Sequence, residues 1–581
     1  MVNLREKPFY LSDDDIRWVE ETRDSMTLEE KIGQLFIMLD RKKDREDERH
    51  LLQDYHLGGC RYENESAEKI YEQNKFYQEC AKIPVLIACN CESGGNGACG
   101  DGTYIASAAA CGATSDTQTA ENVGYVSGVE AAAVGVNWNF APICDIKFNW
   151  RNTVVNTRAY SSDVDKVIEN SKAYIRGMRR SGLAVSAKHF PGDGVEELDQ
   201  HLVMGTNNLS CEEWDATFGR VYKALIDEAE IEAVMVGHIA MPAYERKFNP
   251  GIKDSEILPA TLSPTLIKNL LRGKLGFNGL IVTDASHMGG MTGAMPRYRQ
   301  VPEAIAAGCD MFLFFNDIEE DFGYMMNGYK NGVITDERLN DAVTRILGLK
   351  ARLKLHEKKA NGTLIPPKEG LKVVHCAEHK AMADEAARKS ITLVKNTGNE
   401  LPISPKTHKR AYAIVVSNPP IFRGNKEDPA KELVRRKLTE FGYDVTMHDS
   451  YYDLALKQGL GKETLLQSVL IGSVEEFKSK YDVVFTFINV SGYAQMNNVR
   501  LEWSVKHSTE IPWYVQEVPT VFVGLNYTNH LIDIPMAKTF INAYAPTEEV
   551  LEHLLKKVAG EEPFEGHYED QVFCDRWDTR V

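Results

Sequence analysis

The sequence predicts an α/β protein made of an N-terminal (β/α)8 TIM-like barrel followed by a three-layer α/β sandwich domain. Short β-like runs alternate with longer helical patterns through the first 350 residues, which is typical of βα units around a parallel sheet. Eight such runs are the number that a closed barrel needs. A charged segment with a double proline then separates this region from a second α/β pattern.

The eight predicted barrel strands are short apolar runs, and helical patterns connect them. The strands are expected at 35–39, 58–62, 84–89, 136–141, 185–190, 233–238, 279–284 and 311–315. One connecting helix is expected at 210–230, where Ser210 and Glu213 have the spacing of a capping box. A last helix at 336–355 closes the barrel.

The chain is expected to have three parts. These are a catalytic barrel domain at 1–355, a linker at 356–375 and a C-terminal α/β sandwich domain at 376–581. After a helix at 376–396, apolar runs typical of buried parallel strands occur at 411–417, 481–490, 519–526 and 538–544. Neither a glycine-rich dinucleotide fingerprint nor a phosphate loop accompanies them, so no cofactor is expected.

Composition excludes several classes of partner. The chain has 67 Lys and Arg against 84 Asp and Glu, a net charge of −17, which disfavours nucleic acid and anionic lipid. No apolar run is long enough to span a bilayer, and the N-terminus lacks the apolar stretch of a secretory signal. The eleven cysteines form no metal-binding motif. We therefore expect a cytoplasmic protein without a metal, either a monomer or a homodimer.

Polar and charged residues follow the predicted barrel strands at their C-terminal ends, where a parallel barrel places its active site. Any one of them could be an ordinary ion pair or a polar strand end. Together they predict an active site in which Asn90, Glu92, Lys188, His189 and His238 bind substrate. They are Asn90, Glu92, Asp145, Lys188, His189, His238 and Asp284.

Asp284 is the most specific of these residues. It ends an apolar run, so its carboxylate would lie in a partly desolvated pocket. From there it could attack an electrophilic sugar carbon. The alternative is a hydrogen-bonding role at the barrel rim.

A second cluster lies on the loop after the fifth strand. Three residues, Pro191, Gly192 and Gly194, predict an irregular loop, and this loop carries Asp199 and His201. In an extended segment, residues i and i+2 point the same way, so Asp199 could hold one nitrogen of His201. The other nitrogen would serve as general acid and base. The alternative is a solvated loop where the two residues coincide.

These residues carry a family resemblance. KHFPGDGVEELDQH (188–201) resembles the Lys-His-Phe-Pro-Gly-His-Gly…Asp-Ser-His loop of family 3 glycoside hydrolases of the β-N-acetylglucosaminidase type. GFNGLIVTDASHMGGM (276–291) is similar to the nucleophile segment of that family. Further blocks in the expected order are NFAPICDI, TRAYSSD, PATLS and AIAAGCD, and the resemblance spans about residues 25–355.

The resemblance implies a role for each matching residue. Asp284 would be the nucleophile, and His201, oriented by Asp199, would be the acid/base. Lys188, His189 and Arg158 would bind sugar hydroxyls. The implied activity is that of a retaining exo-acting β-N-acetylglucosaminidase, which cleaves an oligosaccharide or amino-sugar glycoside through a covalent glycosyl-enzyme.

The sequence departs from the family pattern at two places. Asp193 replaces the histidine of Pro-Gly-His-Gly, which we expect to raise the pKa of His201 and to oppose an anionic acceptor. The family's Asp-Gln-Glu-Gly-Gly-Arg block is NCESGGNG at 90–97, without an arginine. The missing arginine would change the contacts to the far hydroxyls of the sugar. The sequence therefore does not specify which sugar is bound.

Three alternatives stay open at this point. Some members of this branch are phosphorylases, so phosphate could replace water as acceptor. A β-glucosidase or β-xylosidase could draw its acid/base from the C-terminal domain, with Glu502 as a candidate. A carbohydrate-binding protein without catalysis would retain the same sugar contacts.

Overall fold

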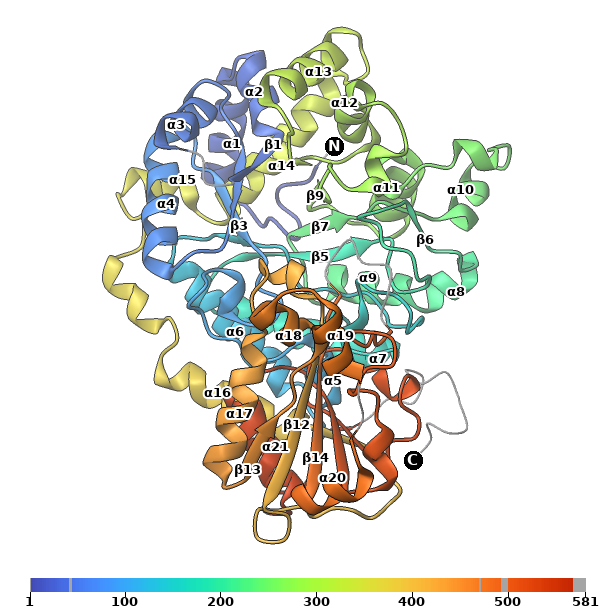
Figure 1. Cartoon of the computed structure of the whole chain (residues 1–581). Helices are drawn as coiled ribbons and strands as arrows, with labels where there is room; N and C mark the ends of the chain where they lie inside the picture. The colour runs from blue at the N-terminus through green and yellow to red at the C-terminus, as the bar shows by residue number, and fades with distance from the viewer. Residues whose placement is uncertain (1, 41–43, 470–471, 493–499, 568–581) are drawn as a thin grey trace. The chain divides into compact units, whose positions relative to one another are not determined.

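The computed structural model describes residues 2–40, 44–469, 472–492 and 500–567. The chain divides into two compact units (Figure 1). The first contains residues 1–105, 117–148 and 161–380, and the second contains residues 106–116, 149–160 and 381–581. Two short segments from the barrel region thus group with the second unit, and the linker groups with the first. The limits 1–355 and 376–581 stay a prediction.

The first unit contains an eight-stranded parallel sheet in the order β10-β1-β2-β3-β4-β5-β7-β9. A parallel bridge between Val282 and Met311 joins its two edge strands, so the sheet nearly closes into the predicted barrel. All eight predicted strands are present, most of them shorter than predicted. They are β1 (Phe36–Asp40), β2 (Gly59–Tyr62), β3 (Leu86–Cys89), β4 (Trp138–Asn139), β5 (Ala184–Phe190), β7 (Ala233–Val236), β9 (Leu280–Thr283) and β10 (Phe312–Leu313).

Helices surround this sheet, as Figure 1 shows for α2, α4, α12 and α13. A small second sheet, β6 (Gly205–Thr206) with β8 (Ile239–Ala240), was not predicted. The helices of the first unit are α1 (Asp13–Ser25), α2 (Leu28–Gln34), α3 (Arg45–Gln53), α4 (Ala67–Cys80), α6 (Gln118–Ala133), α7 (Val164–Arg179), α8 (Cys211–Ala216), α9 (Phe218–Asp227), α10 (Pro242–Phe248), the π-helix η5 (Thr265–Lys274), α11 (Gly289–Thr292), α12 (Arg297–Ala307), α13 (Ile318–Lys330), α14 (Asp336–Arg352) and α15 (Leu355–Ala360).

Two predicted helices differ from the structure. The predicted capping box of Ser210 and Glu213 is present, but the helix at 210–230 is broken at Thr217 into α8 and α9. The hydroxyl of Thr217 donates to the carbonyl of Glu213, a local bond that competes with helix continuation. The helix predicted at 376–396 ends at Ser390 and is followed by a strand, because Ile391, Thr392 and Val394 favour extended backbone.

The second unit is built on a six-stranded sheet in the order β11-β16-β15-β14-β12-β13. The four predicted strands are confirmed and pair in parallel, whereas the unpredicted β11 pairs antiparallel with β16. The strands are β11 (Thr392–Asn396), β12 (Arg410–Ser417), β13 (Asp444–Met447), β14 (Val483–Asn489), β15 (Thr520–Gly524) and β16 (Thr539–Asn542). The helices are α5 (Ala108–Ala113), α16 (Ala377–Ser390, continuing from the first unit), α17 (Pro429–Phe441), α18 (Tyr451–Gln458), α19 (Lys462–Val469), α20 (Val474–Lys480) and α21 (Glu548–Val558).

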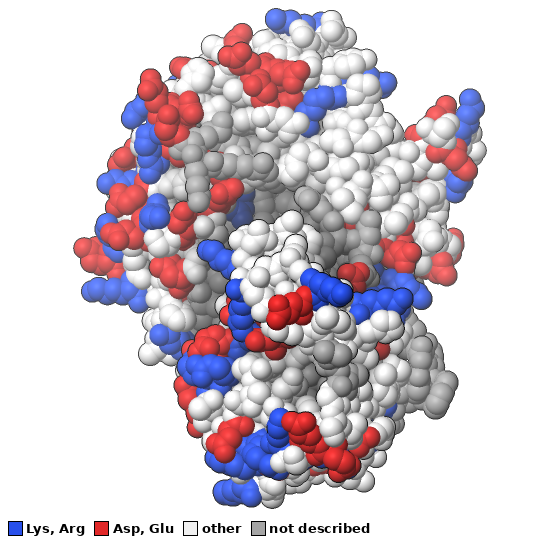
Figure 2. All heavy atoms as spheres, in the orientation of Figure 1, with Lys and Arg blue, Asp and Glu red and all other residues white. Residues whose placement is uncertain are grey.

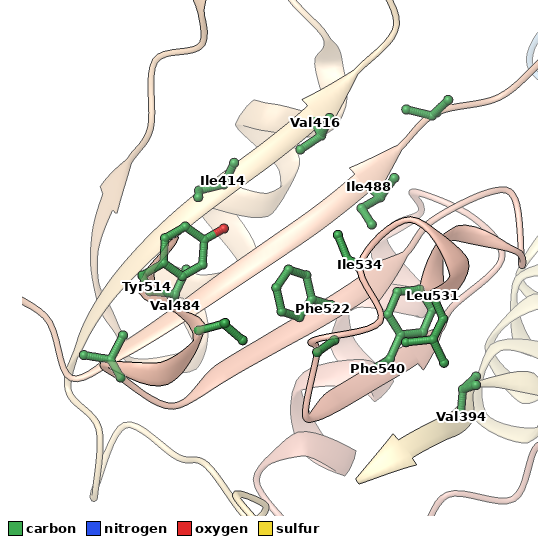
Figure 3. Packing of buried hydrophobic residues seen from close by; sticks show 14 residues of the cluster. Val394, Ile414, Val416, Val484, Ile488, Tyr514, Phe522, Leu531, Ile534 and Phe540 are labelled. Atoms are coloured by element: carbon green, nitrogen blue, oxygen red, sulfur yellow. The ribbon is translucent and has the colours of Figure 1, made fainter. Parts of the chain in front are cut away.

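One face of this sheet buries an apolar cluster (Figure 3). Phe522 lies near the middle of the cluster, Phe540 lies beside Leu531, and the Tyr514 ring lies beside Val484 at one end. Buried Tyr514 still satisfies its hydroxyl, which lies 2.9 Å from Thr486 Oγ1. On the sheet, α17 packs against β12 and β13, and it also contacts α21.

Charge is distributed without segregation on the face shown in Figure 2, where acidic and basic side chains of the described residues are intermixed. Within the described ranges, no helix combines the length and the apolar character needed to cross a membrane.

Replacing Phe522 by Ala should lower the free energy of unfolding of the second unit by about 3–5 kcal/mol, because a fully buried ring leaves a cavity at the centre of the sheet. Urea unfolding followed by circular dichroism would measure the loss. Phe422→Ala is the matched control, since 60% of that side chain is exposed. Equal effects of the two substitutions would contradict the packing described.

Candidate active site

The polar residues predicted at the strand ends do lie there. Asn90 and Glu92 follow β3, and Asp145 follows β4. Lys188 and His189 are the last polar residues of β5. Asp284 follows β9 directly, and His238 follows β7 after Gly237. Because all these strands are parallel, their C-terminal ends share one rim of the barrel.

Asp284 is a buried carboxylate whose side chain is 15% exposed. Its Oδ1 accepts the backbone N–H of Ala285 at 2.7 Å, and its Oδ2 lies 3.9 Å from Nε2 of His189. Burial opposes ionisation, but the electrostatic effect of the neighbouring His189, His238 and His201 rings and the N–H of Ala285 outweigh it, so the pKa of Asp284 lies below its ordinary value. Asp284 is therefore ionised at neutral pH, as a carboxylate nucleophile must be.

His189 is oriented by Asp145, which is fully buried. One carboxylate oxygen of Asp145 lies 2.7 Å from Nδ1 of His189, and the other accepts the backbone N–H groups of His189 and Asp193. Since Nδ1 is committed to Asp145, Nε2 is the nitrogen that points to Asp284. The sequence placed Asp145 at a strand end but did not predict its role. The signal that could have pointed to it is the NFAPICDI block, which contains Asp145 and resembles a block of the family.

Lys188 and Glu92 form an ion pair, with Nζ of Lys188 2.8 Å from Oε1 of Glu92. The lysine side chain is 4% exposed and the glutamate side chain 23%. Both residues were predicted to bind substrate. Their pairing joins the end of β5 to the loop after β3 within the rim.

Asp199 and His201 form the predicted pair. Nδ1 of His201 lies 2.7 Å from Oδ1 of Asp199, which is fully buried, and the His201 ring keeps 25% of its surface exposed. The prediction of an extended segment was wrong, however. The backbone turns here, because the Asp199 carboxylate also accepts the N–H of His201 at 2.8 Å and the Asp199 carbonyl accepts the N–H of Leu202.

This turn is attached to the segment that follows Asp284. The carbonyls of Gln200 and His201 accept the N–H groups of Gly290 and Gly289, at 3.0 and 2.8 Å. A Cβ at Gly289 would lie 2.2 Å from the carbonyl oxygen of Leu202, so only glycine allows this approach. The attachment holds His201 near enough for its charge to act on Asp284.

His238 uses both ring nitrogens within the protein. Nδ1 lies 2.8 Å from Oγ1 of Thr261, and Nε2 lies 2.9 Å from the carbonyl of Ala285, to which it must donate. Burial lowers the pKa of His238, so the ring is neutral at pH 7. It was predicted to bind substrate, and the geometry fits a residue that positions the peptide after Asp284.

Asp193, which stands where the family has histidine, is held inside the loop. Its carboxylate accepts the N–H of Gly194 at 2.6 Å and the side-chain amide of Gln200 at 3.2 Å. Gln200 in turn accepts the backbone N–H of His238 at 2.8 Å. Gln200 therefore links two strand ends, a role that the sequence did not predict. The expected effect of Asp193 on His201 stays a prediction.

Glu130, which is fully buried on α6, binds the segment after β3 through Thr103. The Glu130 carboxylate accepts both the hydroxyl and the N–H of Thr103, at 2.6 and 2.8 Å, and it lies 2.6 Å from Nδ1 of His379. The side chain of Asn90 is exposed at the start of this segment. The remaining predicted residue, Arg158, lies in the short helical turn η2 (Asn156–Arg158), which groups with the second unit.

Among the described residues, one group of side chains could in principle hold a metal ion. It consists of Asp15, His356 and Glu357. Lys354 already places its ammonium 2.7 Å from both Asp15 oxygens and 2.9 Å from Glu357. The Cys89 and Cys91 sulfurs are 3.3 Å apart and buried, and burial raises the pKa of the Cys91 thiol far above its ordinary value, which disfavours the thiolate that binds metal.

Comparison with known proteins identifies the family. A family model described as the glycosyl hydrolase family 3 N terminal domain matches residues 27–349, more than half of the chain. The chain belongs to glycosyl hydrolase family 3. The resemblance carried by residues 188–201 and 276–291 is thereby confirmed, and this family 3 protein is a glycosidase.

Three relatives of this family 3 glycosidase are informative. A beta-N-acetylglucosaminidase/beta-glucosidase from Cellulomonas fimi is 40% identical over the full length of both chains. A beta-hexosaminidase from Chromobacterium violaceum is 33% identical over 201 residues, which cover 35% of this chain and 53% of the relative. The solved beta-glucoside phosphorylase BglX bound to 2FGlc is 38% identical, covers 97% of this chain and 98% of its own, and superposes with a TM-score of 0.89.

Glu196 on the Asp199 loop gives a pH-dependent prediction. Burial raises the pKa of this carboxyl to about 7, with Asp193 and Glu197 adding to the effect and the Thr206 N–H opposing it. The folded protein therefore binds a proton that the unfolded chain releases near pH 4.3, so stability falls as pH rises from about 4.3 to about 7. Glu196→Gln should raise Tm relative to wild type at pH 8 and have little effect at pH 5.

Glu212→Gln is the control, because Glu212 is exposed and is not among the groups that shift the pKa of Glu196. Thermal melts of wild type, Glu196→Gln and the control variant between pH 5 and pH 8 would measure the Tm difference. A Tm difference for Glu196→Gln that does not change with pH would contradict the assignment.

Proposed function

We propose that this family 3 glycosidase is a retaining, exo-acting enzyme that removes a terminal β-linked N-acetylglucosamine, with glucose as a second accepted sugar. The observation that carries the proposal is the pairing of Asp199 with His201 on a loop bound to the segment after Asp284. In this proposal, Asp284 is the ionised carboxylate and His201 the proton-transferring imidazole of one site. Those are the two groups that a double-displacement glycosidase requires.

In the first step, Asp284 attacks the anomeric carbon and the bond to the leaving oxygen breaks. His201 donates a proton from Nε2 to that oxygen, while Nδ1 stays bonded to Asp199. The buried Asp199 carboxylate stabilises the ring while it is protonated and keeps Nε2 directed outward. In the second step, His201 accepts a proton from the incoming water, and the oxygen of that water displaces Asp284 with overall retention.

Sugar hydroxyls would be bound by the charged groups around Asp284. Lys188 supplies an ammonium and Glu92 a carboxylate from the ion pair at the rim. The exposed amide of Asn90 and the imidazole of His189 offer further hydrogen bonds. Arg158 is proposed as a sugar-binding residue on the resemblance of TRAYSSD alone. His238 would act indirectly, through the peptide of Ala285.

The choice of sugar rests on two supports. The loop at 188–201 resembles that of the β-N-acetylglucosaminidase type, and the full-length relative from Cellulomonas fimi is named for both N-acetylglucosamine and glucose. An acid/base from the second unit is less well supported, since Glu502 would leave Asp199 and His201 without a role. A binding protein without catalysis is disfavoured by the presence of the complete set of reacting side chains.

Phosphate instead of water as the acceptor is a second candidate. It is favoured by the likeness to beta-glucoside phosphorylase BglX, at 38% identity over nearly the whole chain. A neutral His201 also repels an incoming dianion less than a carboxylate base would. Phosphate oxygen would attack the anomeric carbon, the bond to Asp284 would break, and a sugar 1-phosphate would leave.

The catalytic roles are tested by two isosteric substitutions. Asp199→Asn should lower kcat by about 10²–10⁴-fold with little change in KM, because the His201 ring loses the charge that orients and stabilises it. Asp284→Asn should reduce turnover of every substrate at least as much. Glu197→Gln on the same loop is the control, and wild-type turnover by Asp284→Asn would remove the proposed nucleophile.

Substrate and acceptor are tested by release of nitrophenol from the β-N-acetylglucosaminide and the β-glucoside, each with and without phosphate. Turnover of the N-acetylated substrate without phosphate dependence would support the hydrolase. A rate that rises with phosphate and yields a sugar 1-phosphate would establish the phosphorylase. Turnover of the glucoside alone would contradict the histidine mechanism.

A further inference from the structure

A cavity of about 540 Å³ lies in the first unit between the π-helix η5 and α14. Lys268 and Arg272 line it from η5, and Arg338, Asp341 and Arg345 line it from α14. No part of the proposed catalytic mechanism uses these residues.

The cavity belongs to the end of the barrel opposite the catalytic groups. Arg272, which lines it, is paired with Asp310, two residues before β10 begins. Asp310 is fully buried and accepts the N–H of Ile281 at 2.8 Å, near the start of β9. The catalytic side chains stand where the strands end, whereas this cavity lies where they begin. A ligand here would not compete with the sugar.

Three guanidinium groups share two carboxylates beside the cavity. Arg272 lies 2.8 Å from Asp310, and Arg338 contacts both Asp310 and Asp341. Arg345 lies 3.0 Å from Asp341 and 3.9 Å from Asp310. The cluster therefore carries one more positive than negative charge.

This surplus charge is largely removed from solvent. The exposed fractions of the Arg272, Arg338 and Arg345 side chains are 17%, 14% and 6%. A buried charge without a counter-charge is costly, so a cluster of this kind is stabilised by any anion that reaches it. The pKa of Arg272 is consistent with a surplus of positive charge. Burial and the neighbouring Arg345 and Arg338 lower this pKa to about 9, although Asp310 opposes the change.

Lys268 and the start of α14 add further positive potential. Within the described part of the chain, the Lys268 ammonium makes no hydrogen bond or ion pair. Lys268 is exposed overall, but partial removal of its side chain from solvent and the nearby Arg338 lower its pKa. Thr335 caps α14, a 17-residue helix whose N-terminal dipole faces the same cavity lining. Glu337 on the rim is the one exposed carboxylate that offsets this charge among the described lining residues.

Arg345 also retains donor capacity. Its Nε binds Asp341 and its Nη1 binds the carbonyls of Asn278 and Gly279, which leaves Nη2 without a partner in the described ranges. A guanidinium edge and an ammonium are the donors that recognise a tetrahedral oxyanion.

We propose that this cavity is a binding site for a tetrahedral oxyanion of the phosphate type, held by Lys268 and Arg345, with Arg272 adding positive charge to the lining. The anion supplies the negative charge that Asp310 and Asp341 do not. The site is separate from any phosphate that acts as acceptor at Asp284.

The experiment measures Tm against phosphate concentration at constant ionic strength, with sodium chloride as the balancing salt. Phosphate should raise the Tm of wild type, because a ligand bound only to the folded state stabilises it. Sulfate should act in the same way, because it is also a tetrahedral oxyanion, and substitutions at Lys268 separate this site from an acceptor site at Asp284.

Lys268→Ala locates the effect. This exposed lysine can be replaced without disturbing the core, and the half-saturating phosphate concentration should rise about fivefold on loss of one nearby charge. Lys268→Glu should abolish the phosphate-dependent rise. Lys330→Ala, which removes an exposed lysine of α13, is the matched control and should behave as wild type.

Either of two results would overturn the proposal. One is the absence of any Tm rise beyond that in sodium chloride. The other is the same phosphate dependence in wild type, Lys268→Ala and Lys268→Glu, which would assign the bound anion to another part of the protein.

Discussion

The carboxylate of Asp145 is the contact on which the catalytic rim depends. It binds the ring and the backbone of His189 and the backbone of Asp193, all from one fully buried position. It thus directs His189 toward Asp284. By accepting the N–H of Asp193, it also holds the start of the loop that carries Asp199 and His201. A single buried acid in the segment after β4 therefore orients the ring beside Asp284 and fixes the first residues of the loop that leads to Asp199 and His201.

The negative charge of Asp284 is surrounded by histidines, which can gain or lose a proton, and by the Lys188–Glu92 ion pair. Three histidines surround the ionised carboxylate, and their bonding differs. His189 is held by Asp145, His238 is neutral and holds a peptide, and the His201 side chain stays 25% exposed while its Nδ1 is bonded to Asp199. Lys188 and Glu92 neutralise each other beside them. In the proposed reaction, the proton moves through His201 without leaving an unpaired buried charge, because the Asp199 carboxylate lies 2.7 Å from Nδ1 of the ring.

The second unit has its own polar organisation. The segment 149–160 is held there by Tyr527, whose hydroxyl donates to the Thr153 carbonyl at 3.1 Å, and by the amide of Asn156, which donates to Asn529 at 3.3 Å. Trp150 packs with Tyr527 and Ile532 in the same place. These contacts explain why a stretch that follows β4 groups with residues almost 400 positions later in the chain.

Local sequence patterns alone specified the fold class, all eight barrel strands, the family and the identity of the candidate catalytic residues. These features depend on apolar periodicity and on motifs that are contiguous in the chain. Other features depend on distant residues and emerged only from the folded chain: the turn that forms the Asp199 and His201 pair, the role of Asp145, the internal bonding of His238 and the antiparallel strand β11. The same holds for the placement of Arg272, Arg338 and Arg345 around two shared aspartates, because no local pattern specifies which side chains meet where η5 and α14 pack together.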